Sequence, residues 1–443
     1  PVTIKESVDV AGIPSTLGLS SRRGQPAARD AVVVRRLREE GALVLGKTNV
    51  PQTLLAPLET TNPLFGTTHN PWSHGHGPGG SSGGAAAALA CGTSVVGVGT
   101  DIGGSIRTPA AMTGVLGLKP TNDRWSNVGS RGLLPGQELI RSQIGPMARS
   151  VRDLELLMDV LSARSMSPLD PRVPPLDDAP VPDRPLVVGV VEDDGFLTPA
   201  TSVRRAVREA ADALERAGCR TLRFSPPNVE ESVWLYFGGV SSDGLATLDA
   251  ALDGETLIEP LRLLGRLGRL PAAARRGLAR GLRLTGETRV PKLLEALGEK
   301  SVKTYWELVA RRTELKREAL EAWDRAGVDL VLGPVFATPA CPIGMSADFT
   351  LGFSYVCRYN LLDRPAGVVP VSRVRTDELV RSNTRDRVEK RAAAIEEESA
   401  GLPLAVQLAG RPFGERTVLR AMALLEAEVR EGESFPATPI DPR

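Results

Sequence analysis

Long apolar runs that do not alternate with polar residues are the feature that most constrains the fold of this chain. Three of them, at residues 327–335, 366–374 and 402–410, read GVDLVLGPV, AGVVPVSRV and LPLAVQLAG. Continuous apolar runs of this length indicate strands that are buried on both faces, as in sheets covered by helices. We therefore expect one large α/β domain, covering residues 1–443, with insertions.

Amphipathic helices alternate with such runs along the chain. Residues 28–41 have helical spacing, end at a glycine and lead into the apolar run ALVLG. Residues 201–218 place their apolar side chains on one face, with Ser202 as the expected N-terminal cap and Gly218 as the stop. Residues 167–185 contain seven prolines, so we expect a surface connector without helix or central strand.

Overall composition excludes several classes of protein. The net charge of +1 gives no reason to expect nucleic acid as a partner. The four cysteines are widely separated, which favours a reducing compartment over a disulfide framework. No stretch reaches the roughly 18 uninterrupted apolar residues of a membrane-spanning helix. Because the sequence opens inside the apolar stretch PVTIKES without a methionine, we expect it to be a fragment, and an upstream signal or anchor stays open.

Residues 261–290 break the balanced charge pattern. They contain eight arginines against one acidic residue, Glu287, with leucines interleaved. A helix with a leucine face and an arginine face can lie in the headgroup layer of an anionic membrane. An ordinary pair of surface helices with a solvated basic side fits this stretch equally well.

Glycines surround three serines in the first quarter of the chain. GPGGSSGG contains Ser81 and Ser82, and a Gly-Gly pair directly precedes Ser105. No phosphate-binding glycine motif is present. Backbone N–H groups of glycines next to a serine hydroxyl are instead typical of an oxyanion hole beside its nucleophile. Close packing between helices and strands is the alternative explanation for either glycine cluster.

A serine nucleophile needs a group that removes its proton. All three histidines fall within residues 69–76, without a cysteine or carboxylate beside them, so we expect a solvated loop rather than a zinc site. A lysine in a dry site has a lowered pKa and can act as the base. Lys5, Lys47 and Lys119 end or interrupt apolar runs. Their positions alone do not choose among them, since a lysine at a strand end usually extends to water.

The serine motifs resemble those of a known family. GGSSGG, GTDIGGSIRTPA and GLKPT, with Ser105 placed 24 positions after Ser81, are similar to the signature of the amidase signature family. The resemblance implies a large mixed twisted sheet covered by helices, with no metal or cofactor. Lys5 matches the family's upstream lysine motif, whereas Lys47 does not. The resemblance thus implies Lys5 as the base, Ser81 in a cis peptide as the relay, and Ser105 as the nucleophile.

Two further sets of residues follow from the same resemblance. The oxyanion N–H groups are expected from Ile102, Gly103, Gly104 and Ser105. Supporting hydrogen bonds are expected from Ser82 and Thr100, while Asp101 and Arg107 are expected to hold the loop without touching substrate.

Further segments, including NPLFGTTHNPW and YNLLDRPAGVVPV, resemble the fatty-acid amide hydrolases within this family. This resemblance implies hydrolysis of lipid amides, namely N-acylethanolamines and primary fatty amides such as oleamide. It also implies a homodimer at the cytosolic side of the endoplasmic reticulum membrane, with residues 258–298 as a basic amphipathic helical cap on the membrane surface. The acyl channel is expected to include Leu54, Leu55 and Phe353.

The sequence departs from this resemblance in two places, one of which is the cap, which is richer in arginine and poorer in aromatic residues than the resemblance implies. Residues 378–399 are highly charged and lack aromatic residues, which predicts a differently shaped acyl channel. A soluble amidase acting on small amides, or an amidotransferase subunit, remains the alternative enzyme. A catalytically silent membrane-binding scaffold is disfavoured, because Lys5, Ser81 and Ser105 are all present.

Overall fold

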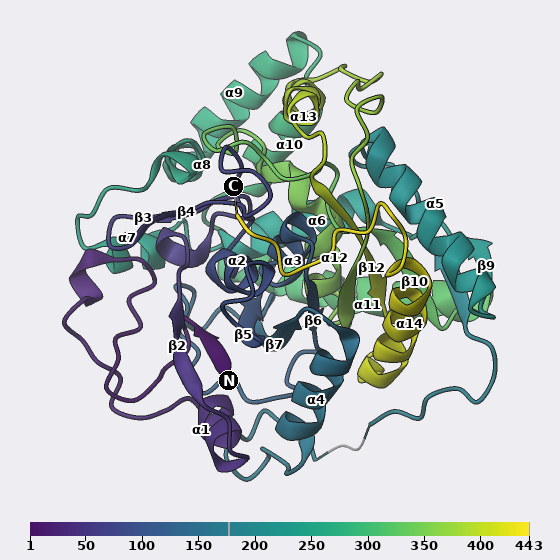
Figure 1. The fold of residues 1–443 in the computed structure, drawn as a ribbon. Helices are drawn as coiled ribbons and strands as arrows, with labels where there is room; N and C mark the ends of the chain where they lie inside the picture. The colour runs from purple at the N-terminus through teal and green to yellow at the C-terminus, as the bar shows by residue number, and fades with distance from the viewer. Residues whose placement is uncertain (176–177, 443) are drawn as a thin grey trace.

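The computed structural model describes residues 1–175 and 178–442. A ten-stranded mixed sheet runs through the molecule in the order β2-β1-β5-β7-β6-β11-β12-β10-β8-β9 (Figure 1). Its strands are β1 Val2–Lys5, β2 Val44–Thr48, β5 Val96–Asp101, β6 Leu116–Lys119, β7 Gln143–Ala148, β8 Val187–Val190, β9 Arg220–Arg223, β10 Leu330–Pro334, β11 Ala366–Arg373 and β12 Pro403–Ala409. A separate pair consists of β3 Thr60–Asn62 and β4 Gly66–Thr68. The prediction of an α/β fold is confirmed.

Fourteen α-helices surround the sheet in the described residues. They are α1 Val32–Glu39, α2 Gly83–Ala90, α3 Arg107–Thr113, α4 Val151–Ser162, α5 Thr201–Arg216, α6 Val229–Val240, α7 Ala246–Leu252, α8 Glu259–Arg269, α9 Ala272–Leu284, α10 Arg289–Ala296, α11 Val302–Ala326, α12 Ser354–Leu361, α13 Arg387–Glu397 and α14 Glu415–Val429. Helices α2, α3, α4, α5 and α14 pack directly on strands of the large sheet. None of the described helices combines the length and hydrophobicity that crossing a bilayer requires.

The three apolar runs form strands, as their composition predicts, and the structure shows that these strands are neighbours in the sheet. β11 and β12 are antiparallel neighbours, β10 pairs with the other edge of β12, and all three are buried. The predicted helix at residues 201–218 is α5, and Gly218 follows its last turn with φ of +86°. The expected cap is wrong, because the helix already starts at Thr201 and the Ser202 side chain is buried. The proline-rich connector has no helix or strand in its described residues, and residues 176–177 lie outside them.

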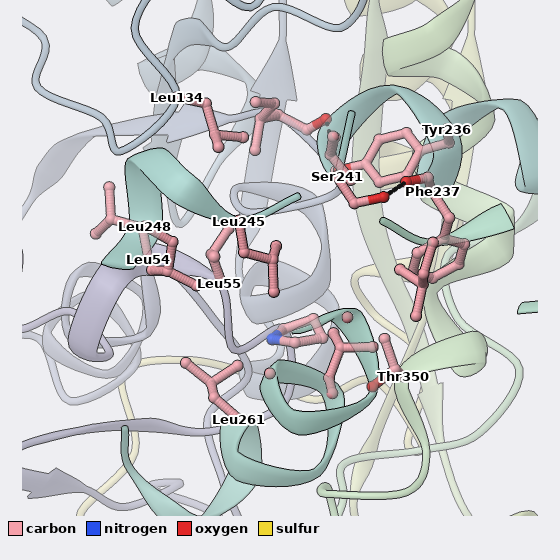
Figure 2. A pocket seen from close by; sticks show the side chains of 18 of the residues that line it. Leu54, Leu55, Leu134, Tyr236, Phe237, Ser241, Leu245, Leu248, Leu261 and Thr350 are labelled. Atoms are coloured by element: carbon pink, nitrogen blue, oxygen red, sulfur yellow. Dashed lines mark hydrogen bonds between the residues drawn. The ribbon is translucent and has the colours of Figure 1, made fainter. Parts of the chain in front are cut away.

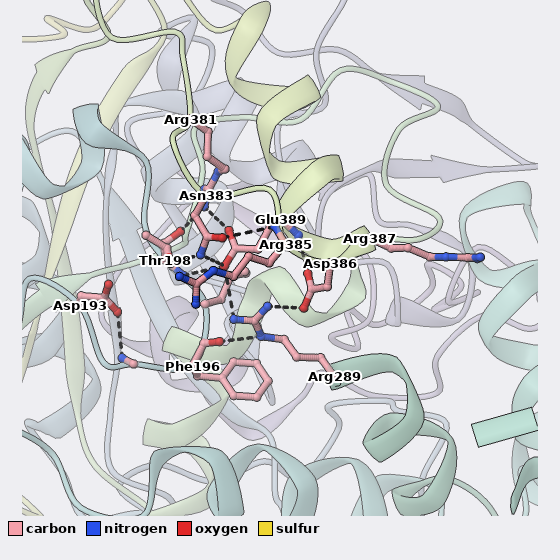
Figure 3. Close-up of polar contacts among 12 residues, drawn as sticks. Asp193, Phe196, Thr198, Arg289, Arg381, Asn383, Arg385, Asp386, Arg387 and Glu389 are labelled. Atoms are coloured by element: carbon pink, nitrogen blue, oxygen red, sulfur yellow. Dashed lines mark hydrogen bonds and ion pairs between the residues drawn. The ribbon is translucent and has the colours of Figure 1, made fainter. Parts of the chain in front are cut away.

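Residues 258–298 form α8, α9 and α10, and α13 lies beside α10 near the top of the view (Figure 1). The charged stretch 378–399 contacts this cap through ion pairs between side chains rather than through aromatic side chains (Figure 3). Arg289, at the start of α10, donates to Phe196 O at 2.7 Å and pairs with Asp386 and Glu389. The buried Arg381 pairs with Glu389 from the same stretch. Charged residues of this stretch therefore connect α10 to the body of the protein.

Candidate active site

Lys5 lies at the carboxyl end of β1, and Thr100 lies near the carboxyl end of the parallel neighbour β5. Its Nζ donates to Ser81 Oγ at 2.7 Å, to Thr100 Oγ1 at 2.8 Å and to Thr100 O at 3.3 Å. The side chain is fully buried. Burial lowers the pKa of the Lys5 amine to about 7. The negative charges of Asp101 and Glu6 act in the opposite direction and raise this pKa, but burial has the larger effect. A substantial fraction of this amine is therefore neutral near neutral pH.

The two serines of the first cluster lie between Lys5 and the loop of Ser105. The Gly80–Ser81 peptide bond is cis, as expected from the resemblance. Ser82 N donates to Ser105 O at 3.0 Å, and Ser82 Oγ lies 3.5 Å from Thr100 O. A side chain at Gly80 would overlap the carbonyl oxygen of Ala56, so the backbone needs a glycine there to approach so closely. The backbone of Ser82 therefore links the segment of Ser81 to the turn of Ser105.

Ser105 lies in the turn between β5 and α3 and is 8% exposed. It shares a polar cavity with Ser81 and Thr100. The N–H groups of Ile102, Gly103 and Ser105 donate to no acceptor within the described part of the chain. The Gly104 N–H differs from expectation, because it donates to Asp101 Oδ1 at 2.7 Å. The Gly104 N–H therefore stabilises the turn and is not available to donate to a substrate oxygen.

A buried ionic network lies beneath this turn. Asp101 accepts from Arg107 Nε at 3.0 Å and from Asn360 Nδ2 at 2.9 Å. Arg107 also donates to Gln407 Oε1 at 3.0 Å. Burial alone would raise the pKa of the Asp101 carboxyl, but the charge and hydrogen bonds of Arg107 hold it well below its usual range. Neither Asp101 nor Arg107 is among the residues that line the cavities at Ser105.

The other two candidate lysines have different partners. Lys47 Nζ donates to Pro14 O at 2.7 Å and Ser15 Oγ at 2.8 Å. Lys119 Nζ donates to Pro120 O at 2.7 Å and is fully buried, so it does not extend to water. Of the three, Lys5 is the lysine in contact with Ser81 Oγ.

The histidine loop carries no metal cluster. His69 and His74 are exposed, and His69 Nδ1 lies 2.7 Å from His74 O. His76 is buried against Ser73, so the expectation of a solvated loop is wrong for this residue. Among the described residues, no group of three His, Cys, Asp or Glu side chains has the geometry of a metal site.

A largely apolar cavity opens beside Ser105 (Figure 2). The three expected channel residues, Leu54, Leu55 and Phe353, all line it. The cap supplies another part of the wall, because Leu261 and Leu264 of α8 also line the cavity. The leucines of residues 261–290 therefore do not form a single outward face. The further lining residues are Pro57, Ile102, Gly103, Leu134, Tyr236, Phe237, Val240, Ser241, Leu245, Leu248, Leu257, Gly265, Gly268, Leu297 and Thr350.

Sequence reasoning missed the aromatic side chains that α6 contributes. Tyr236 Oη donates to Ile102 O at 3.3 Å, and its ring centre lies 5.4 Å from that of Phe353. A side chain at Gly103 would overlap the Tyr236 hydroxyl, so the glycine admits this close contact. The available signal was the aromatic cluster in SVWLYF, residues 232–237, within a chain of only 4% aromatic residues. Asn360 and Gln407 were also missed, although both lie in segments that carried the resemblance.

Comparison with known proteins agrees with this geometry. The model of the family described as Amidase matches residues 1–419. Fatty-acid amide hydrolase 1 of Sus scrofa is 38% identical over 98% of this chain and 76% of its own length. Fatty acid amide hydrolase 1 of Caenorhabditis elegans is 34% identical over 97% of this chain and 76% of its own. A solved structure of a fatty acid amide hydrolase superposes with a TM-score of 0.82 at 26% identity, covering 99% of this chain and 74% of that one.

The chain belongs to the amidase signature family and is an amide-cleaving hydrolase.

Proposed function

We propose that this chain hydrolyses fatty-acid amides, including N-acylethanolamines and primary fatty amides such as oleamide, to a fatty acid and an amine. The observation that carries the proposal is the cavity lined by leucine and aromatic side chains directly beside Ser105. Burial of each methylene of an acyl chain in such a cavity contributes about 0.8 kcal/mol. The similarity to two enzymes named fatty-acid amide hydrolase 1 supports the same substrate class.

The proposed first half-reaction acylates Ser105. Neutral Lys5 accepts the proton of Ser81 along their 2.7 Å contact, and Ser81 accepts the proton of Ser105. Ser105 Oγ then forms a bond to the amide carbon, and the N–H groups of Ile102, Gly103 and Ser105 stabilise the negative oxygen. The proton returns through Ser81 to the amide nitrogen as the carbon–nitrogen bond breaks, so the amine leaves neutral.

The proposed second half-reaction releases the fatty acid. Water loses a proton to the same relay and adds its oxygen to the acyl carbon. The carbon–oxygen bond to Ser105 then breaks, and the proton restores the Ser105 hydroxyl. Ser81 and Thr100 face the polar cavity that also contains Ser105, which offers space for water and for the departing amine.

A panel of amides of increasing acyl length tests the substrate class. We expect kcat/KM to rise at least about a hundredfold from butyramide to oleamide, because each added buried methylene contributes about 0.8 kcal/mol to transition-state binding. The measurement is ammonia release at fixed enzyme concentration. Higher kcat/KM for butyramide than for oleamide would instead favour the alternative, a small-amide amidase or an amidotransferase subunit.

We also propose that the outer side of the cap binds an anionic membrane surface. Leu284 of α9 is 90% exposed, and Leu278, Arg276 and Arg280 are exposed on the same helix. Three other arginines of the stretch are occupied by carboxylates, in the pairs Arg269–Asp249, Arg283–Glu295 and Arg289–Asp386.

Flotation with vesicles tests this surface. Replacing both Arg276 and Arg280 by serine is expected to weaken binding to vesicles containing phosphatidylserine by about 2 kcal/mol, because each arginine near such a surface contributes about 1 kcal/mol. Binding to neutral phosphatidylcholine vesicles should change little. Equal flotation of the variant and the parent protein with anionic vesicles would contradict the proposed surface.

Location and self-association complete the proposal. An enzyme that takes its substrates from a bilayer fits a membrane-associated location at the cytosolic face of the endoplasmic reticulum, with access through the cap. A homodimer is proposed on the resemblance alone, and sedimentation equilibrium of the purified chain tests it.

A further inference from the structure

The acyl cavity extends along α6 away from Ser105. Tyr236 marks the near end, because its hydroxyl donates to Ile102 O in the turn of the proposed nucleophile. Ser241, directly after the last residue of α6, also lines the cavity. At a rise of about 1.5 Å per residue, Ser241 lies about 7 Å further along the helix than Tyr236. We call the part of the cavity wall around Ser241, further along α6 from the turn of Ser105, its distal end.

The ends of two cap helices close this distal end. Gly298, which follows α10, donates its N–H to Ser241 Oγ at 3.0 Å, and Ser241 Oγ donates to Phe237 O at 2.7 Å. Leu297, beside Gly298, lines the cavity, and so does Gly268 in the last turn of α8. The distal wall is thus built from the carboxyl ends of α8 and α10.

A buried arginine of α9 joins these two helix ends. Arg275 is 6% exposed, and its Nη1 donates to Gly268 O at 3.3 Å and to Leu270 O. Its guanidinium lies against Gly298, where an added side chain would overlap the guanidinium nitrogens and where φ is +87°. Within the described chain, no carboxylate lies within ion-pair distance of Arg275.

A lysine also binds the carboxyl end of α10. Lys300 Nζ donates to Ala296 O at 2.7 Å, to Leu297 O at 3.1 Å and to Gly298 O at 2.8 Å. Burial and the nearby charge of Arg275 lower the pKa of Lys300 to about 8. Carbonyl groups at helix ends carry partial negative charge and favour such cations. Two cations thus bind the carbonyl ends of α8 and α10 directly behind Leu297 and Gly268.

We infer that Arg275 and Lys300 are positioning residues that hold the distal wall of the acyl cavity and thereby set the preference for long acyl chains. The inference rests on the proposed function. A long acyl chain reaches the wall formed by Leu297 and Gly268, whereas a short one ends near Ser105. Removing the guanidinium leaves buried carbonyl groups without donors, and the wall relaxes away from the chain.

The variant Arg275→Met tests the inference, because methionine keeps an apolar stem and removes the donors. We expect the ratio of kcat/KM for oleamide to that for butyramide to fall about tenfold, equivalent to about 1.4 kcal/mol. The loss should appear in the KM for oleamide. The kcat for butyramide and the rate of labelling by a small fluorophosphonate should stay unchanged. Assays are run without vesicles, so that membrane binding does not contribute.

Arg283→Met is the matched control, because Arg283 also joins α9 to α10 but through an exposed pair with Glu295. It should leave the ratio unchanged. If Arg275→Met does not fold, Lys300→Met, at a half-buried position, carries the same test. An unchanged ratio in the folded variant, or an equal loss for both amides, overturns the inference. The parent protein separates the two proposals, because a parent that prefers butyramide overturns the proposed function as well.

Discussion

Replacing Lys5 by alanine is expected to lower amide turnover by about a thousandfold, the size of contribution that a positioned general base makes. The physical reason is the 2.7 Å contact between Lys5 Nζ and Ser81 Oγ in a fully buried site, where no other described lysine contacts Ser81. The measurement is the steady-state hydrolysis of oleamide, with thermal unfolding as the check that the fold is intact.

Lys47→Ala is the matched control for Lys5→Ala. Lys47 lies on the neighbouring strand β2, and burial lowers its pKa to about 8, yet it donates to Pro14 and Ser15 rather than to a serine of the site. This variant should retain nearly full turnover. Full activity in folded Lys5→Ala, or an equal loss in both variants, would remove Lys5 from the proposed relay.

The same amine sets the expected pH dependence of turnover. Burial lowers the pKa of Lys5 to about 7, and only the neutral amine accepts a proton. As pH rises through about 7 the neutral fraction grows, so kcat/KM should increase with pH below this value and level off above it. A profile that falls between pH 6 and 8 would contradict a neutral Lys5 as the base.

The second large effect is expected for Ser105→Ala. This variant should show no labelling by a fluorophosphonate probe and no oleamide hydrolysis above background, because the proposed nucleophilic hydroxyl is lost while the free N–H groups of Ile102 and Gly103 remain. Mass spectrometry of the labelled parent protein should place the probe on the peptide that contains Ser105.

Ser81→Ala provides the comparison that separates relay from nucleophile. It should slow labelling without moving the probe from Ser105, because the nucleophile remains while its proton acceptor is lost. Persistent labelling of Ser105→Ala would assign the nucleophile to another side chain.

The central strands and the lysine partner of Ser81 could both be predicted from the sequence, but the two predictions rest on different kinds of evidence. Strands β10, β11 and β12 consist mainly of apolar residues in continuous runs, so burial on both faces follows from composition. Lys5, by contrast, could not be separated from Lys47 and Lys119 by its own apolar run. It was selected through the resemblance, and the structure places its amine against Ser81.

Other features depended on tertiary contacts that a linear pattern does not contain. The periodicity of α8 defines a leucine face but does not show which part of the protein that face contacts. In the structure, Leu261 and Leu264 line the cavity beside Ser105. Asn360 and Tyr236 contact the turn of the proposed nucleophile from positions more than 130 residues away. The Gly104 N–H could be assigned only after the position of the Asp101 carboxylate was known.

The turn that presents Ser105 depends on a strand made very late in the chain. Arg107, which holds Asp101 in that turn, donates to Gln407, 300 residues further along the sequence. During synthesis on the ribosome, Ser105 emerges long before its supporting strand does. We therefore expect nascent chains to stay without amidase activity until the segment that contains β12 has been translated.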